Sequence, residues 1–394
     1  MLTTIRFLTA VALAPLIAGC RAASTPALEP LALPFTVDTL RTSEPRDGVV
    51  HRFIYSATGP WAIHVLEARA DRCWSLAALK SSGGAIGRQP TSELVRTAAA
   101  REEMAGGVNA DFFLFTPPGV PVGLLVADGR LIAGPIAQPA LAADSAGRVH
   151  IGPFETAGYA TVNHERVELT GWNRDAPNGV AFFDPEWGSA TDTASSVIEV
   201  VLDDSPAYRV AMIDTMPAGV MIPATGAVLK VGRNAPAVVR SMMLAVPLGS
   251  PVTVVVSLRP FNPREAVGGR PMLVRAGTIA THLDSVGRSG FATSRHPRTA
   301  AGISRDGSRV YLVTVDGRQA PHSDGMTLAE LATLMLALGS HEAVNLDGGG
   351  STAMVLGQGD TAFRVVNRPS DRGGERAVGD AVGLVRRCRT PTAP

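Results

Sequence analysis

Two short segments of the chain place an asparagine and an aspartate two positions apart. Asn109 and Asp111 form one pair, and Asn345 and Asp347 form the other. Side chains two apart on a strand point to the same face. Each pair therefore predicts an amide and a carboxylate side by side at a strand end. A capped turn explains one such pair equally well, but its occurrence twice favours a polar site.

A run of small residues follows the second pair. Gly348, Gly349, Gly350 and Ser351 come directly after Asp347. Successive backbone N–H groups without bulky side chains can converge on an anion. No Gly-Lys-Ser/Thr follows, which excludes a nucleotide P-loop, and the apolar run after Ser351 does not open a helix as a dinucleotide fingerprint requires. The run predicts a phosphate cradle, with a tight strand connection as the alternative.

Cations and a third carboxylate come from three further segments. These contribute His296, Arg298, Asp316, Arg318 and Arg376. Arginine suits bidentate binding of phosphate oxygens. Arg298 is our first choice for that role, and His296 is a candidate proton shuttle. In the simpler interpretation, Asp316 begins a hairpin turn and the arginines are solvated.

The elements that must position these residues are mainly strands. Short aliphatic and β-branched runs between Gly and Pro predict strands at 62–68, 107–113, 123–126, 197–202, 252–258 and 310–315. Helical periodicity occurs at 91–104 and at 327–338, where Thr327 and Glu330 form a capping-box pattern. We expect one large mixed α/β (α+β) domain over residues 48–388, built on a mostly β mixed sheet with a few packed helices.

Composition limits the classes of partner. The chain has 394 residues, 36 Lys and Arg against 35 Asp and Glu, and 45% hydrophobic residues. This balance argues against a nucleic-acid partner. Lys80 and Lys230 are the chain's two lysines, so a cationic site for an anion must be built from arginine.

The N-terminus has the pattern of an export signal. Residues 1–19 carry one cation before a short apolar stretch, which predicts a secretory signal peptide. The stretch ends at Leu16–Cys20, which resembles a bacterial lipobox with Cys20 as the acylated residue. Arg21 fits outer-membrane sorting. We expect export with lipid anchoring in the cell envelope, a flexible tether over 20–47 and a disordered tail over 389–394.

Two cysteines remain after Cys20. Cys73 and Cys388 lie near the two ends of the predicted domain. In an oxidising compartment they can form a disulfide that closes a long loop, or each can be a buried thiol. Neither has a second ligand at the spacing of a zinc site.

Longer motifs connect the candidate residues in a characteristic order. They are Asn109–Phe113, Gly268–Leu273, Pro297–Ile303, Val315–Arg318, Gly325–Leu331, Asn345–Thr352 and Asn367–Ser370. Their order and spacing resemble the phosphodiester glycosidase family over about residues 48–388. The resemblance implies a hydrolase that removes a sugar, such as N-acetylglucosamine, joined through its anomeric carbon to a phosphodiester on an envelope or environmental glycan.

The chemistry of that reaction matches the residue types. The leaving phosphate monoester has a second pKa of about 6, so it departs as a stable anion and needs cations more than a strong acid. We expect Asp347 and Asp111 to be the carboxylate pair, without assigning their individual roles. Asn109 and Asn345 are expected to orient the sugar or the carboxylates. The cations and the glycine run are expected to hold the phosphate.

Two other functions remain open from the sequence. In the first, Asp111, Asp316 and Asp347 bind Ca²⁺ or Mg²⁺ in a metal-dependent phosphodiesterase; otherwise no cofactor is expected. In the second, the chain is an envelope lipoprotein that binds phosphate-bearing glycans without turnover. The products separate the enzymes, because C–O cleavage releases free sugar and P–O cleavage releases a sugar phosphate. The sugar, the aglycone, the stereochemical course and the oligomeric state are left open.

Overall fold

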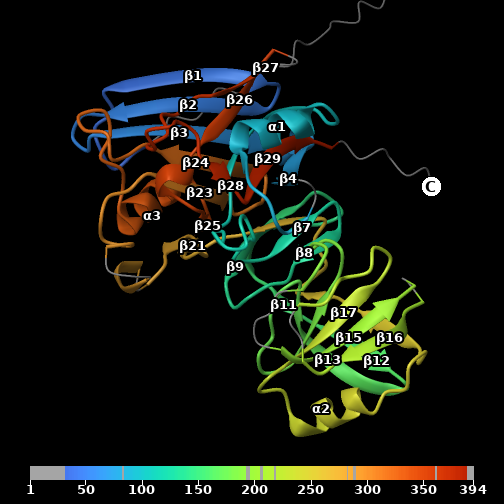
Figure 1. Ribbon diagram of the computed structural model, residues 1–394. Coiled ribbons are helices and arrows are strands. Elements are labelled where there is room, and N and C mark those ends of the chain that lie inside the picture. The colour runs from blue at the N-terminus through green and yellow to red at the C-terminus, as the bar shows by residue number, and fades with distance from the viewer. Residues whose placement is uncertain are drawn as a thin grey trace, which may run out of the picture. The chain divides into compact units, whose positions relative to one another are not determined.

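Strands are the main regular element of the structure, and three helices are found in its described part (Figure 1). The computed structural model describes residues 32–81, 84–191, 196–204, 207–216, 219–281, 283–286, 290–359 and 362–387. All of these residues except the first belong to one compact unit. The single, mostly β domain with a few short helices is thus confirmed, and it is richer in strands than the mixed α/β class that was expected.

The largest sheet has eight strands in the order β1-β2-β3-β24-β23-β25-β21-β22. All of the pairings in this sheet are antiparallel. Their bounds are β1 Thr39–Arg46, β2 Val49–Ser56, β3 Trp61–Arg69, β21 Met272–Arg275, β22 Thr278–Ile279, β23 Arg298–Ile303, β24 Arg309–Val315 and β25 Glu342–Asn345.

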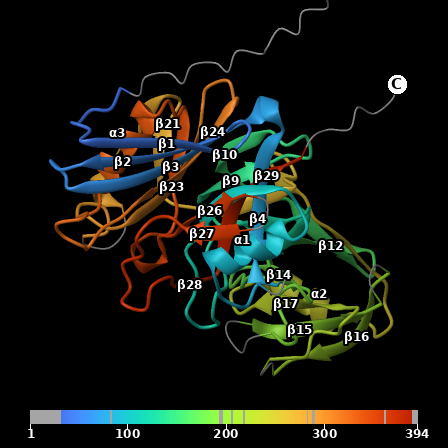
Figure 2. The same ribbon diagram turned by 90° about the horizontal axis from the view of Figure 1, so that it is seen from above.

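A five-stranded sheet carries the first Asn–Asp pair. Its order is β27-β26-β6-β29-β4. Figure 2 shows α1 next to β4 and β29 of this sheet. The bounds are β4 Trp74–Lys80, β6 Met104–Asn109, β26 Met354–Gln358, β27 Ala362–Val365 and β29 Asp380–Arg386. The glycines of β6 are required by packing, because a Cβ at Gly106 would lie 2.3 Å from the Val355 carbonyl oxygen.

The remaining strands form two larger sheets and two short ladders. A second five-stranded sheet has the order β10-β9-β20-β7-β8, and a seven-stranded sheet has the order β16-β15-β17-β14-β13-β12-β18. The bounds of the first are β7 Leu125–Ala127, β8 Arg130–Ala133, β9 Pro139–Ala143, β10 Val149–Pro153 and β20 Glu265–Gly268. Those of the second are β12 Gly158–Val162, β13 Glu165–Trp172, β14 Val180–Phe183, β15 Ser196–Asp203, β16 Arg209–Asp214, β17 Ala227–Gly232 and β18 Val252–Val255. The ladders pair β5 Gln89–Pro90 with β28 Ala377–Val378, and β11 Glu155–Thr156 with β19 Leu258–Arg259.

The helices are short. They are α1 Thr91–Ala99, α2 Ala237–Leu244 and α3 Leu328–Ala337, with single 3₁₀ turns at Ala70–Arg72, Leu283–Ser285 and Gly349–Ser351. The predicted capping box is confirmed, because Glu330 N–H donates to Thr327 Oγ1 at 3.1 Å and Thr327 N–H donates to Glu330 Oε2 at 2.9 Å. Helix α3 buries Leu328, Leu331 and Met335, the apolar positions that its spacing predicts.

Most of the predicted strands are confirmed, with shifted ends. The run at 107–113 is the main exception, because β6 ends at Asn109. The strand that leads into the second Asn–Asp pair also ends at its asparagine, since β25 ends at Asn345. Both aspartates therefore lie in the turn beyond a strand rather than on it. Helix α1 also ends at Ala99 instead of continuing to 104, because Met104 already begins β6.

The N-terminal predictions are tested only in part. The predicted tether extended to residue 47, but Thr39–Arg46 forms β1 and pairs with β2, which corrects that boundary. The signal peptide, Cys20 and the tail at 389–394 lie outside the described residues. None of the helices in the described ranges is long and apolar enough to cross a membrane.

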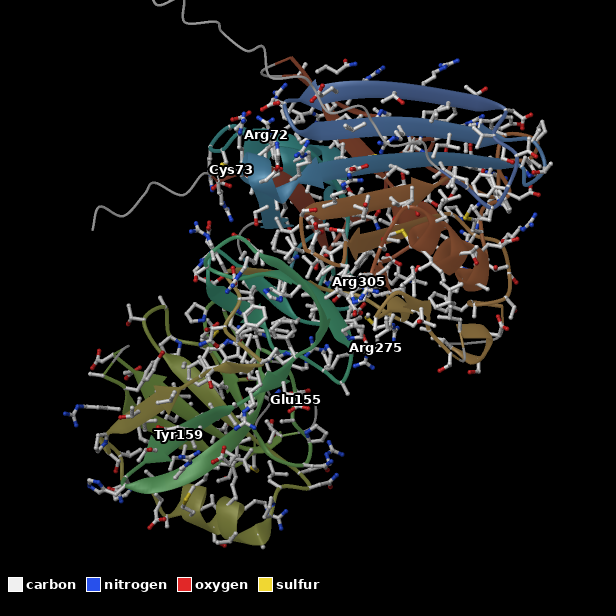
Figure 3. All side chains as sticks on the ribbon, turned by 180° about the vertical axis from the view of Figure 1, so that it is seen from behind. Arg72, Cys73, Glu155, Tyr159, Arg275 and Arg305 are labelled. Carbon is white, nitrogen blue, oxygen red and sulfur yellow. The ribbon has the colours of Figure 1, made fainter. Side chains whose placement is uncertain are left out.

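Cys73 lies at the turn before β4 (Figure 3). It is disulfide-bonded, and its carbonyl oxygen accepts from the N–H of Arg387 at 2.8 Å. Cys388 lies outside the described residues, so its pairing with Cys73 stays a prediction.

Candidate functional site

The two Asn–Asp segments meet in the fold. The Asn109 side-chain amide donates to the Asp347 carbonyl oxygen at 2.6 Å, and Asp347 N–H donates to the Ala110 carbonyl oxygen at 2.8 Å. The Asn109 Oδ1 atom accepts from Thr299 Oγ1 at 2.8 Å and from Ala353 N–H at 3.2 Å. Asn109 is fully buried, and its amide nitrogen and oxygen are both bonded, so it positions Asp347 rather than contacting a sugar.

Asp111 lies behind this junction and is only 1% exposed. Its Oδ1 accepts from Phe112 N–H and its Oδ2 accepts from Gly123 N–H. The backbone comes very close here, because a Cβ at Gly268 would lie 2.5 Å from Asp111 Oδ2. Burial raises the pKa of Asp111 well above its ordinary value, the charge of Asp380 raises it further, and the two N–H donors oppose the change.

Asp380 is a third carboxylate that the sequence analysis did not select. It is the first residue of β29, is fully buried, and its Oδ1 accepts from Asp111 N–H at 2.7 Å. Its Oδ2 has no hydrogen-bond partner in the described structure. Burial raises the pKa of Asp380 to about 6, the charge of Lys80 opposes this, and the charge of Asp347 adds to it.

Asp347 is the partly exposed member of the three carboxylates. Burial raises its pKa to about 6, and nearby Ser351, the Gly348 N–H and the charges of Arg376 and Arg270 oppose the change. Because neighbouring carboxylates repel one another, the group of Asp111, Asp347 and Asp380 retains at least one proton at mildly acidic pH. We call these three residues the carboxylate cluster.

Three arginines lie beside Asp347 and the glycine run that follows it. The Arg318 guanidinium lies beside Gly349, where an added Cβ would be 3.3 Å from both of its terminal nitrogens. Arg376 lies beside Gly350 and is held by Asp371 through bonds of 2.8 and 3.0 Å. Arg270 adds a third charge; this exposed arginine was not among the predicted site residues.

Arg270 lies 4.9 Å from the centre of the Phe112 ring. Its charge and that of Arg376 both act on Asp347. The Arg270 carbonyl oxygen also accepts from the side-chain amide of Asn345 at 2.6 Å. Asn345 therefore positions Arg270, while its buried Oδ1 has no partner in the described structure. We call Arg270, Arg318 and Arg376 the arginine ring.

The glycine run differs from the predicted phosphate cradle. Gly348 N–H donates to Asp347 Oδ1 at 2.9 Å, Gly349 N–H to the Pro297 carbonyl oxygen at 2.9 Å, and Ser351 N–H to the Gly348 carbonyl oxygen at 3.2 Å. These donors are used to fold the turn and cannot also bind a phosphate. The absence of side chains instead lets the arginine ring approach the turn.

Arg298 does not have the position expected of a phosphate ligand. It is 2% exposed, and its guanidinium donates to the carbonyl oxygens of Met326, Phe291 and Ser294 at 2.8, 2.7 and 3.1 Å. Burial lowers its pKa to about 10, and the charge of Arg318 adds to this effect. Arg298 therefore fixes the loop before β23.

His296 is half-buried beside the arginine ring. Its Nδ1 lies 3.2 Å from an Arg318 terminal nitrogen, and its backbone pairs with Met326. Burial lowers the pKa of His296, and the charges of Arg318 and Arg298 lower it further. The neutral ring can accept from Arg318 and thereby orient it.

Asp316 is bonded to residues outside the carboxylate cluster. Its carboxylate accepts from His322 Nε2 at 2.9 Å, from the Asn367 amide at 3.0 Å and from Arg368 N–H at 3.0 and 3.1 Å. These bonds occupy both carboxylate oxygens, and a catalytic role for Asp316 stays a prediction. Within the described ranges, no group of three or more His, Cys, Asp or Glu side chains is arranged to hold a metal ion.

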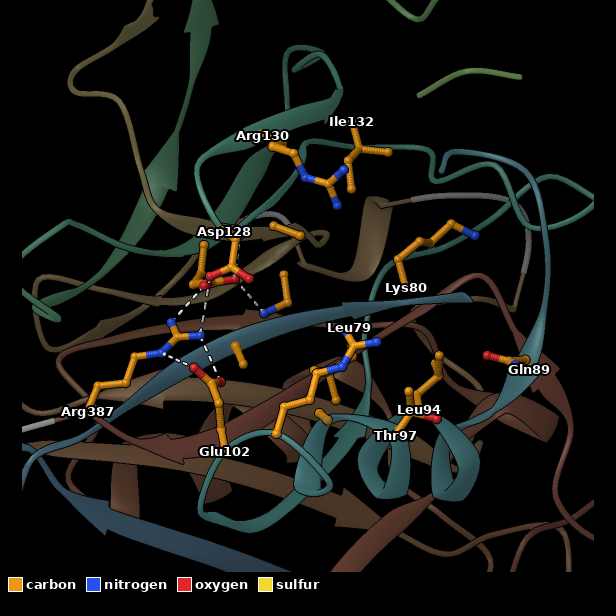
Figure 4. A pocket seen from close by; sticks show the side chains of 16 residues that line it. Leu79, Lys80, Gln89, Leu94, Thr97, Glu102, Asp128, Arg130, Ile132 and Arg387 are labelled. Carbon is orange, nitrogen blue, oxygen red and sulfur yellow. Dashed lines mark hydrogen bonds and ion pairs between the residues drawn. The ribbon is translucent and has the colours of Figure 1, made fainter. Parts of the chain in front are cut away.

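A cavity of about 850 Å³ lies between β4, α1 and the β7–β8 turn (Figure 4). Arg387 crosses it and pairs with Glu102 at 2.9 Å and with Glu265 at 2.7 Å. These opposite charges neutralise one another. Lys80 lines the same cavity, and its ammonium group donates to the carbonyl oxygens of Gly87 and Gly119 at 2.6 and 3.1 Å. The cavity is thus lined by Lys80, whose charge lowers the pKa of Asp380.

Residues 188–385 match the sequence model of the phosphodiester glycosidase family, which is half of the chain. The chain belongs to the phosphodiester glycosidase family. The matched range contains Asp347, Asp380 and the arginine ring, whereas Asn109 and Asp111 precede it. The family is thus supported directly over the C-terminal part of the broader range, 48–388, in which the motifs resemble it.

Individual relatives of this glycosidase-family chain extend the comparison. The prophage-derived protein YomE of Bacillus subtilis is 41% identical over 90 residues, which are 23% of this chain and 13% of YomE. The chain thus spans a small part of that relative. A crystal structure of a Synechocystis protein matches with a TM-score of 0.73 at 22% identity over 89% of this chain and 64% of that one. A Burkholderia pseudomallei protein named as exported matches with a TM-score of 0.64 at 26% identity, over 83% and 74% of the two chains.

Proposed function

We propose that this chain hydrolyses the glycosidic C–O bond of a sugar-1-phosphodiester. The observation that carries the proposal is the position of the partly exposed Asp347 within the arginine ring. A sugar joined to a phosphodiester needs a carboxylate near the anomeric carbon and cations near the phosphate. Family membership supports the same class of substrate.

The cations serve the leaving group. When the bond between the anomeric carbon and the bridging oxygen breaks, its electron pair stays on that oxygen, and a phosphate monoester leaves. Water supplies the hydroxyl group of the released sugar, and its proton passes to a base or to solvent. Arg318 and Arg376 stabilise the charge that develops on the phosphate, so no strong general acid is needed.

Asp347 is the carboxylate that we assign to the anomeric centre. It is partly exposed, whereas Asp111 is buried with both oxygens bonded to N–H groups. Asp111 and Asp380 act from behind by fixing the backbone next to Asp347. An ionised Asp347 stabilises the oxocarbenium-like transition state or attacks the anomeric carbon.

The experiment uses the methyl phosphodiester of N-acetylglucosamine 1-phosphate in ¹⁸O-labelled water. C–O cleavage places the label in the released sugar, and we expect Asp347→Asn to lower kcat by about 10³-fold or more. Asp284→Asn, an exposed substitution in a 3₁₀ turn, is the matched control. Label in the phosphate would identify a phosphodiesterase instead. Unlabelled, intact ligand after long incubation would overturn the enzyme assignment for this substrate.

Export and lipid anchoring belong to the same proposal. The lipobox pattern ending at Cys20 supports both, and the name of the related Burkholderia protein supports export. Mass spectrometry of the mature N-terminus is expected to find an acylated Cys20, and Cys20→Ser is expected to release the protein from membranes. An unmodified N-terminus at another residue would overturn the anchor.

A further inference from the structure

A second cavity has a different charge from the one beside α1. It has a volume of about 770 Å³ and lies between strands β1–β3 and the β26–β27 hairpin. Its lining includes Arg41 from β1, Arg364 from β27 and Arg368 from the segment after β27. We call this cavity the arginine pocket. Lining from separate parts of the sequence makes it a feature of the fold rather than of one loop.

The three guanidinium charges are not neutralised by carboxylates. Within the described structure, no ion pair involves Arg41, Arg364 or Arg368. Arg41 lies 5.9 Å from the centre of the Phe53 ring, and Arg364 donates to the amide oxygen of Gln358 once that amide is turned to satisfy both groups. Both partners are uncharged, so the positive charges remain available to a ligand.

The acidic residues of the pocket do not cancel this charge. Asp316 is 1% exposed and is already bonded to His322, Asn367 and the Arg368 backbone. Glu44 accepts from Gly48 N–H at 3.2 Å on the exposed strand β1. The pocket therefore presents more positive than negative charge to its interior.

Histidines add neutral hydrogen-bonding groups. His51 Nε2 and His64 Nδ1 lie 3.1 Å apart. Burial lowers the pKa of His51 to about 4, and the charge of Arg364 lowers it further. Burial likewise lowers the pKa of His64 to about 3. Both rings are neutral at pH 7, and both line the pocket together with Arg364.

One segment joins the arginine pocket to the carboxylate cluster. Asp316 lines the pocket, and Arg318, two residues later, belongs to the arginine ring. The Gln319 side chain donates to the Arg368 carbonyl oxygen at 2.9 Å. Asn367 also binds the carbonyl oxygen of Thr352, which follows the glycine run. The segment 316–319 thus connects residues of the pocket with a residue of the arginine ring.

We propose that the arginine pocket binds a second phosphate-bearing group, so that the preferred ligand carries several phosphates. This inference rests on the proposed function for its kinetic part, because the second group is then the continuation of the aglycone beyond the scissile phosphodiester. A free polyphosphate anion has the same chemistry. Arginine guanidinium groups bind such oxygens through charge-assisted hydrogen bonds.

The first test measures binding and needs no activity. Inorganic tripolyphosphate is titrated calorimetrically into the wild-type protein, Asp347→Asn and the double variant Arg41→Gln/Arg364→Gln. We expect the first two to bind alike and the double variant to bind at least about tenfold more weakly. The control is Arg275→Gln/Arg305→Gln, which removes two exposed arginines elsewhere (Figure 3). Equal affinity of both double variants for tripolyphosphate would overturn the proposal that the arginine pocket binds phosphate.

The second test distinguishes the source of the phosphate. It compares the methyl phosphodiester with the same sugar 1-phosphate esterified to di(glycerol phosphate). If the pocket holds the aglycone, the longer substrate has a KM about tenfold lower, and Arg41→Gln/Arg364→Gln removes only this advantage. If the two substrates have equal KM values and the double variant still loses tripolyphosphate binding, the pocket binds a free anion. Inactivity toward both substrates would sink the proposed function and leave the binding result standing.

Discussion

The side-chain amide of Asn109 donates to the main-chain carbonyl of Asp347 at 2.6 Å, across 238 positions of sequence. The reciprocal bond runs from Asp347 N–H to Ala110. The two Asn–Asp segments therefore hold one another at the ends of β6 and β25, which belong to different sheets. Asn109 fixes the backbone from which the Asp347 carboxylate reaches the arginine ring.

Asn109→Ala is expected to impair both folding and turnover. It leaves the Asp347 carbonyl and the Thr299 hydroxyl without their partner in a buried environment, which costs about 1–3 kcal/mol of unfolding free energy. Because the carboxylate is then less well positioned, we expect kcat to fall by more than KM rises. Urea unfolding and steady-state kinetics measure the two effects. Asn178→Ala, on the exposed surface, is the control. Equal stability of the two variants would show that Asn109 does not hold the two segments together.

The sequence predicts the partners of this junction better than their roles. Residue type and spacing identified Asn109, Asp111, Asn345 and Asp347 because the pattern is repeated. It left open whether the asparagines orient the sugar or the carboxylates, because hydrogen-bond partners far apart in sequence cannot be read from one segment. The strands were predictable from aliphatic runs, whereas their ends depended on contacts between sheets.

Asp380 had no local signal. It precedes an apolar run as many surface aspartates do, and only the pairing of β29 with β6 and β4 brings it to Asp111 and Lys80. Arg298 shows the opposite error. Its motif predicted that it binds phosphate, but the side chain is buried and its guanidinium donates to three carbonyl oxygens instead. Burial of this kind is decided by tertiary packing.

Substitution of Arg298 and Arg318 is expected to have opposite consequences. Arg298→Met leaves three carbonyl oxygens unbonded and is expected to lower the unfolding free energy by about 2–4 kcal/mol. Arg318→Met is expected to leave stability within about 0.5 kcal/mol, because the side chain is exposed, and to raise KM about tenfold. Arg372→Met, an exposed neighbour of the arginine ring, is the control. A raised KM for Arg298→Met at unchanged stability would restore its predicted phosphate role.

The carboxylate cluster predicts an unusual dependence of stability on pH. Burial raises the pKa of Asp380 to about 6, so the folded state binds more protons than the unfolded state between about pH 4 and 6. The unfolding free energy contributed by this group therefore falls as the pH rises through that range. Asp380→Asn removes the effect. Its unfolding free energy relative to that of the wild type is therefore expected to rise by up to about 3 kcal/mol from pH 4 to pH 7.

The same substitution is expected to change the pH profile of turnover. The charge of Asp347 raises the pKa of Asp380, and repulsion between like charges is mutual. Without a charge at position 380, Asp347 ionises at lower pH, so the acid limb of kcat/KM moves to lower pH. Urea titrations at several pH values and a pH–rate profile measure both effects, with Asp284→Asn as the control. If Asp380→Asn and Asp284→Asn differ from the wild type by the same unfolding free energy at both pH 4 and pH 7, then Asp380 ionises in the folded state without cost.

Gly268→Ala tests the close approach of backbone to Asp111. A Cβ at Gly268 would lie 2.5 Å from Asp111 Oδ2 and 2.8 Å from Gly123 Cα. Neither neighbour can yield easily, because Gly123 N–H is bonded to that same carboxylate. We expect a loss of about 1–3 kcal/mol of unfolding free energy and a fall in kcat as Asp111 is displaced. Gly152→Ala in β10 is the matched control, since nothing lies within 4 Å of its added Cβ. Equal unfolding midpoints for the two variants would mean that β20 shifts freely, and that the Asp111 carboxylate is not fixed by the glycines packed around it.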